Sequence, residues 1–222
     1  MKIIYLEDEV LKINTWLAKE NSLRQNKKLN YKDLFLKNLF EKFKSQELEI
    51  KGNFPIFKCK NFKFELDERK LTSKLIYGGD KEKIDAFDDW NLDHIPNTIK
   101  KFYDFFEKIS IDEELKIIYQ SYMNCINKNT TTTEGWVPIL DILSEYIKSK
   151  QNINNELKYS EKVFFSFLIY LIAQKPDQTI HGKKMGRRTA THTAAGNKNE
   201  HLWIPLNKED LLGENIMYLS FK

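Results

Sequence analysis

The sequence is poor in cysteine, proline, glycine and arginine, with 2, 5, 8 and 4 of these residues among 222. Cys59 and Cys125 lie far apart and form no C-x-x-C spacing, which excludes a disulfide scaffold and a cysteine-based zinc site. They are typical of reduced thiols in a cytoplasmic protein. The glycines follow neither of the two glycine-rich phosphate-binding motifs, G-x-x-x-x-G-K-[ST] and G-x-G-x-x-G, so no nucleotide-cradling loop and no cofactor is expected.

Long apolar runs are also absent. The most hydrophobic run, Val163–Ala173, has eleven residues, whereas about 20 are needed to span a bilayer. It is expected to form a buried core helix. The opening residues MKIIYLEDEV carry acids where a signal peptide needs a basic region followed by an apolar one. These observations predict a cytoplasmic protein without a membrane partner.

Positive charge is concentrated in residues 181–198, which we call the basic segment. The chain has a formal net charge of +4, and the string HGKKMGRRTATHTAAGNK alone carries five positive side chains and no acid. The rest of the chain is therefore about neutral. Lysine and arginine interleaved with Gly, Thr and Asn are the groups that contact a phosphate backbone. The adjacent Arg187 and Arg188 are suited to bidentate phosphate contacts.

The basic segment predicts a nucleic-acid-binding protein, with DNA as the first expected partner and RNA as the second. The side chains expected to contact nucleic acid are Lys183, Lys184, Arg187, Arg188, Thr189, Thr191, Thr193, Asn197 and Lys198. Affinity for such a partner is expected to fall steeply with salt. The sequence is also compatible with an oligomer of identical chains.

Two other functions are open. In a nuclease of restriction or toxin type, His192 or His181 would move a proton while Arg187 stabilised the phosphate. Residues 187–192 resemble the R-x4-H pattern of HEPN ribonucleases, which are helical, and this resemblance implies catalytic roles for Arg187 and His192. The histidine spacings match no zinc site, so no metal is expected. The third hypothesis is a protein-binding adaptor or inhibitor that docks through aromatic residues.

Hydrophobic periodicity predicts an α+β fold that is mostly helical. Residues 2–6 are expected to form a strand, and residues 7–20 and 31–46 to form helices. Between residues 47 and 77, apolar and charged side chains alternate, which predicts a small antiparallel sheet of three or four strands. The glycine pair at 78–79 is the expected boundary between domains 1–79 and 80–222, unless the chain forms one continuous domain.

The second half is predicted to be helical up to residue 174. Apolar stripes at 99–109 and 115–126 indicate two helices, and segments 136–147 and 160–174 indicate two more. Residues 201–206 and 215–221 predict a C-terminal β-hairpin-like strand pair, in which Pro205 places the first strand at a sheet edge. A helix, a basic loop and a strand pair in this order resemble the layout of a winged DNA-binding module.

Overall fold

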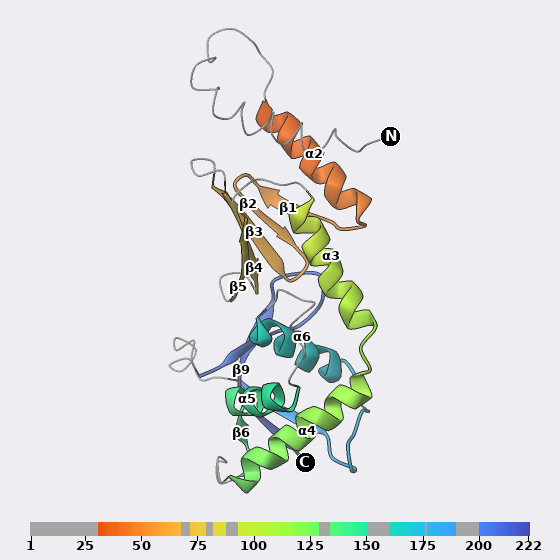
Figure 1. The fold of residues 1–222 in the computed structure, drawn as a ribbon, viewed down its shortest axis with the longest axis vertical. Helices are drawn as coiled ribbons and strands as arrows, with labels where there is room; N and C mark the ends of the chain where they lie inside the picture. Colours follow the sequence, from red (N-terminus) through yellow and green to blue (C-terminus); the bar gives the residue numbers. More distant parts are fainter. Residues whose placement is uncertain are drawn as a thin grey trace.

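The protein has an α+β fold, as predicted (Figure 1). The computed structural model describes residues 31–67, 72–78, 82–87, 93–128, 134–150, 160–175, 177–189 and 200–222. The expected strand at 2–6 and helix at 7–20 lie outside these ranges. The described elements form two sheets, each packed against helices, and one hydrophobic core runs through both.

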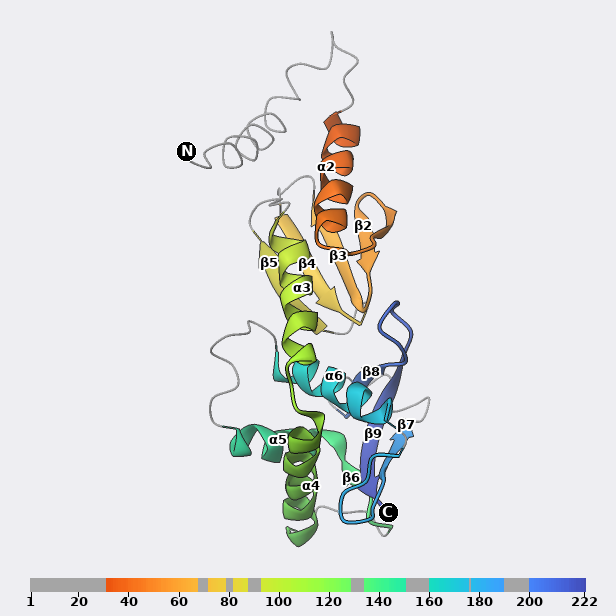
Figure 2. The ribbon, with the colours of Figure 1, turned by 90° about the vertical axis from the view of Figure 1, so that its right-hand side faces the viewer.

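The N-terminal half is an antiparallel sheet with the strand order β1-β2-β3-β4-β5. Its strands are β1 (Lys51–Asn53), β2 (Ile56–Cys59), β3 (Phe62–Asp67), β4 (Thr72–Tyr77) and β5 (Glu82–Phe87). Helices α2 (Tyr31–Ser45) and α3 (His94–Glu107) lie on the same face of it (Figure 1, Figure 2). Because β5 pairs with β4, the sheet continues past the predicted boundary at 78–79. The division into two domains stays a prediction.

Aromatic side chains of β3 attach both helices to the sheet. The Phe64 ring stacks on Phe43 of α2 and on Phe57 of β2, with centroid distances of 5.3 and 5.2 Å. Two residues earlier on the same face, the Phe62 ring meets Phe102 of α3 edge-on at 5.1 Å. The period-two alternation expected for this strand therefore buries its apolar face under α2 and α3.

The C-terminal half packs three helices against a second antiparallel sheet. The helices are α4 (Ile111–Asn127), α5 (Ile139–Ser149) and α6 (Glu161–Ala173); the strands are β6 (Val137–Pro138), β7 (Met185–Thr189), β8 (Leu202–Pro205) and β9 (Gly213–Phe221). Strands β8 and β9 form the predicted antiparallel pair. The residue pairing puts β6 and β8 along one side of β9 and β7 along the other. Among the described strands, β8 pairs with β9 alone, which agrees with the edge location inferred from Pro205.

Helix α6 connects the two halves because nearly all of its surface is apolar and buried. It begins at the predicted N-cap, where Ser160 Oγ accepts a hydrogen bond from the backbone N–H of Val163. In its middle, the Phe167 ring lies 5.0 Å from Phe102 and 4.7 Å from Phe106 of α3. None of the described helices is long and apolar enough to cross a membrane.

The indole of Trp203 fills the junction between the two sheets. It packs against two glycines, Gly78 directly after β4 and Gly213 at the start of β9: a Cβ on Gly78 would lie 2.6 Å from the ring, and one on Gly213 would lie 2.2 Å from it. The ring of Tyr77 meets the indole edge-on at 5.2 Å. In addition, the Ser166 hydroxyl of α6 donates to the Trp203 carbonyl at 2.5 Å. This contact fixes β8 against β4 and α6.

A buried asparagine forms the second contact between the halves. Asn61, which is fully buried, donates through Nδ2 to the carbonyls of Asn207 at 2.8 Å and Asp210 at 2.6 Å. Its Oδ1 accepts from the Tyr103 hydroxyl at 3.1 Å. Burial raises the pKa of Tyr103 well above its usual value, so this hydroxyl stays a donor at neutral pH. The amide therefore ties the β8–β9 connection to β3 and α3.

The two cysteines are buried and form no disulfide, as expected for reduced thiols. Cys59 faces the core from β2, where burial raises the pKa of its thiol to about 12. Only the thiolate is a strong nucleophile. Burial therefore keeps the Cys59 thiol protonated at neutral pH.

Asn61→Ala is predicted to lower the free energy of unfolding by about 3 kcal/mol, because it leaves two carbonyls and a buried hydroxyl without their hydrogen bonds. Urea denaturation followed by circular dichroism measures the loss. The control is Asn127→Ala, at an exposed position of α4, for which a change below about 0.5 kcal/mol is expected. Equal effects of the two substitutions would show that Asn61 does not hold the halves together.

Gly213→Ala is predicted to cost about 3 kcal/mol, because its methyl group would overlap the Trp203 indole and force it to move. Gly182→Ala is the comparison: nothing lies within 4 Å of its Cβ, and only its φ of +74° opposes a side chain. That strain costs about 1 kcal/mol. The same denaturation assay compares the two variants, and a larger loss for Gly182→Ala would contradict the proposed packing.

Candidate nucleic-acid interface

The described part of the basic segment begins with a tight turn. Ile180 and Lys183 exchange two backbone hydrogen bonds of 2.9 Å, and the residues between them, His181 and Gly182, have φ values of 51° and 74°. Positive φ at both central positions defines a type I′ turn, whose twist matches that of adjacent strands. The turn directs the following residues along β9.

Residues 185–189 form strand β7, so the prediction of a basic loop is wrong for this stretch. Met185–Thr189 pairs antiparallel with β9, and Lys184 exchanges two further backbone hydrogen bonds with Lys222, at 2.7 and 3.0 Å. The sequence MGRRT has little of the apolar alternation that marks a strand. Its strand geometry comes from backbone pairing with the long apolar strand β9.

Neighbouring side chains of β7 point to opposite faces of the sheet, as in any strand. Arg187 is paired with the buried Leu219, on the face that packs against the helices. Arg188 is paired with Tyr218, on the other face, which we call the open face. The open face comprises Lys184, Gly186, Arg188, Tyr218, Ser220 and Lys222. The two arginines therefore do not clamp one phosphate together.

The four described cations of the basic segment are exposed. Lys183, Lys184, Arg187 and Arg188 form no ion pair with any residue of the described ranges. Lysines elsewhere do find carboxylates: Lys150, for example, pairs with the buried Glu114. The charges of β7 and its turn are therefore not neutralised by described carboxylates, and they attract anions from solution.

An aromatic ring covers the centre of the open face. The partly buried Trp136, just before β6, lies above Gly186: a Cβ at that glycine would be 3.4 Å from the indole and 2.7 Å from Ser220 Oγ. The Lys222 ammonium lies over the indole, 5.0 Å from its centroid. A cation–π contact at such an exposed site contributes about 0.5–1 kcal/mol. The partly buried ring therefore lies beside a cation of the open face.

His181 lies away from the open face. Its ring is 5.4 Å from Tyr119 of α4, which in turn packs on Phe221. Lys183, which follows the turn, is four residues from Arg187, about 13 Å along an extended strand. No described contact joins His181 to Arg187, and a joint catalytic role for them stays a prediction.

The remaining candidates lie outside the described residues: Thr191, His192, Thr193, Asn197 and Lys198. Their roles stay predictions. The resemblance to HEPN ribonucleases is nevertheless contradicted at Arg187. The R-x4-H pattern begins at Arg187 on a strand, whereas HEPN ribonucleases are helical. Strands β8 and β9 form the strand pair of the winged layout, while β7 takes the place of part of its basic loop. The resemblance to a winged module stays a prediction.

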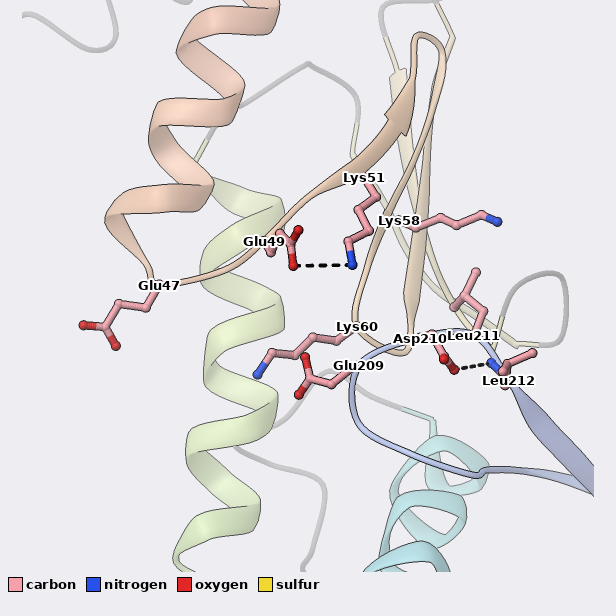
Figure 3. Close-up of a pocket in the computed structure, with 9 residues that line it drawn as sticks. All are labelled: Glu47, Glu49, Lys51, Lys58, Lys60, Glu209, Asp210, Leu211 and Leu212. Carbon is pink, nitrogen blue, oxygen red and sulfur yellow. Dashed lines mark hydrogen bonds and ion pairs between the residues drawn. The ribbon is translucent and has the colours of Figure 1, made fainter.

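A cavity of about 410 Å³ lies elsewhere, between β1, β2 and the connection from β8 to β9 (Figure 3). It is lined by Glu47, Glu49, Lys51, Lys58, Lys60, Glu209, Asp210, Leu211 and Leu212. Its four carboxylates outnumber its three ammonium groups, and Lys51 pairs with Glu49 at 3.4 Å. The cavity therefore carries no excess of positive charge that would favour a polyanion. Among the described residues, no group of three or more His, Cys, Asp or Glu side chains is placed to hold a metal.

Trp136, Tyr218 and Lys222 were not identified as candidates from the sequence. A signal existed for Tyr218, since alternation in the predicted strand 215–221 places it opposite the apolar Leu219. No sequence signal marked Trp136. It was expected to begin a helix, but it precedes the short strand β6. No protein-family model, curated protein or solved structure matches this chain.

Proposed function

We propose that this protein binds nucleic acid through the basic segment. The observation that supports the proposal is the exposure of four cations on β7 and its turn, none of them paired with a described carboxylate. A phosphate backbone supplies the missing negative charge in a regular array, and neutralising it releases counterions. DNA and RNA both offer this array, and DNA remains the first partner to test.

Protection of a sheet edge is the competing explanation of these charges. Strand β7 pairs with β9 alone among the described strands, and charged side chains on an edge strand prevent aggregation. Isolated lysines suffice for that role. The basic segment instead uses half of the arginines of the chain and surrounds them with Thr, Asn and Gly, which add directional hydrogen-bond donors. This composition favours phosphate recognition.

A nuclease built on His181 and Arg187 is an alternative for which no described contact between the two side chains gives support. The pair His192 and Arg187 remains a hypothesis. Oligonucleotides recovered after incubation with the protein, with and without EDTA, are therefore to be checked for cleavage. Cleavage lost in His192→Ala would assign catalysis to the basic segment in addition to binding.

The double variant Arg187→Ala with Arg188→Ala is predicted to lower affinity for DNA and RNA oligonucleotides by about tenfold or more, because two charge-assisted phosphate contacts are lost. Fluorescence anisotropy at about 100 mM salt measures the affinity. Thermal unfolding is expected to stay unchanged, since both side chains are exposed.

The matched control removes the same charge from a distant surface. Lys37 and Lys44 are exposed on α2, at the far end of the molecule from β9 (Figure 1). Their double alanine variant is expected to bind within about twofold of wild type, because its charges lie beyond a Debye length of about 10 Å. Equal effects of the two double variants would reduce the proposal to unspecific electrostatics, and no effect of either would refute it.

A further inference from the structure

The N-terminal sheet has one face on which none of the described helices lies, and we call it the outer face. Helices α2 and α3 cover the opposite face, where Phe57 and Phe64 are buried (Figure 1, Figure 2). Because side chains alternate along a strand, β2, β3 and β4 direct a second set to the outer face: Ile56, Lys58, Lys63, Glu65, Lys74 and Ile76. All six are charged or aliphatic, and three of them, Ile56, Lys58 and Lys74, are exposed.

Three lysines stand side by side in the pairing of β1, β2 and β3. Lys51 is paired with Lys58, and Lys58 is paired in turn with Lys63. Like charges at directly opposite positions of a sheet are destabilising. Glu49 compensates the first lysine at 3.4 Å, and Glu65 compensates the third at 2.9 Å. The exposed Lys58, in the middle, forms no ion pair with any carboxylate of the described ranges. Its charge is therefore open to an anionic group of another molecule.

Exposed aliphatic side chains border this row of lysines. Ile56 of β2 is 43% exposed, and Leu206 and Leu212 of the β8–β9 connection are 46% and 62% exposed. The backbone N–H of Leu206 donates to the carbonyl of Leu212 at 3.0 Å, which brings the two leucines together. Leu212 and Lys58 line the same cavity (Figure 3), and the hydrogen bonds of Asn61 hold the connection in place. Clustered apolar side chains at a polar surface mark an interaction site.

Carboxylates close to the row distinguish a protein partner from a polyanion. Glu49 and Glu65 pair with its outer lysines, and Glu209 and Asp210 line the cavity next to Lys58. The phosphates of a nucleic acid or of an anionic membrane carry one sign of charge and would be repelled by these acids. A protein can present a carboxylate to the lysine, donors to the acids and apolar side chains to the leucines at once. The basic segment, by contrast, contains no acid.

We infer that the outer face docks a partner protein through an acidic segment that also carries apolar side chains. A carboxylate of this segment pairs with Lys58, and its apolar side chains pack on Ile56 and Leu212. The inference goes beyond the proposed function, because it concerns the other sheet and a different class of ligand. With both sites, the protein is an adaptor between a nucleic acid and another protein.

The test uses the full chain and three fluorescein-labelled peptides of about 18 residues, which is five helical turns. The first peptide combines Glu with Leu at helical spacing; the second has Lys in place of Glu, and the third has Ser in place of Leu. Fluorescence anisotropy gives the dissociation constants. Wild type is expected to bind the first peptide about tenfold or more tightly than the others, because only the first supplies both carboxylates and apolar side chains. Absence of this preference would overturn the inference.

Variants of the outer face locate the binding. Lys58→Glu reverses the charge and is expected to weaken binding of the first peptide about tenfold or more, and Leu212→Ser is expected to weaken it several-fold. Thermal unfolding verifies that both variants are folded. Lys44→Glu, at an exposed position of α2, is the matched control and is expected to bind within about twofold of wild type. Equal effects of the two charge reversals, or full affinity in a folded Leu212→Ser variant, contradict docking on the outer face.

Oligothymidylate separates this site from the basic segment. Lys58→Glu is expected to keep its affinity for oligothymidylate within about twofold, and the variant Arg187→Ala with Arg188→Ala is expected to keep its affinity for the first peptide within the same limit. Loss of the peptide in the arginine variant, or loss of oligothymidylate in Lys58→Glu, overturns the inference. A wild type that binds oligothymidylate but no peptide overturns the inference and leaves the proposed function standing. One that binds the first peptide but not oligothymidylate supports the inference and refutes the proposed function.

Discussion

Strand β9 is the element on which the rest of the structure depends. Its first half pairs with β8. The indole of Trp203 in β8 packs between Gly78, directly after β4, and Gly213 of β9. The second half of β9 pairs with β6 on one side and β7 on the other. The apolar side chains of β9 therefore anchor the C-terminal core, while its backbone holds in place a strand that has few apolar residues of its own. The basic surface is positioned by the same hydrogen bonds that complete the fold.

The periodicity of apolar residues predicted the fold class and most elements, because each pattern lies within one short stretch of sequence. The alternation of Phe62, Phe64 and Leu66 identified β3, and Ser160 marked the start of α6. Strand β7 was missed because its conformation is imposed by a partner more than 20 residues away. The extra strand β5 was missed for a related reason, since a glycine pair within a hairpin has the same composition as one between domains.

The clustering of positively charged residues predicted the candidate site better than the periodicity of apolar residues did. The excess of cations without acids located the basic segment, and the structure exposes its described members. Sequence could not show that Arg187 and Arg188 face opposite ways, because this requires strand geometry. It also could not bring Trp136 over Gly186, which is 50 residues away in the chain. Such contacts depend on how β6, β7 and β9 are ordered in the sheet, and short segments carry no signal for that order.

The electrostatic basis of the proposal can be measured on the unmodified protein. The observed affinity of the full chain for oligothymidylate is followed between about 50 and 200 mM salt. If the four described cations of the basic segment all meet phosphates, the logarithm of the binding constant falls with the logarithm of salt concentration with a slope of about −3. A slope near zero, or no binding at about 50 mM salt, would contradict recognition of nucleic acid by this surface.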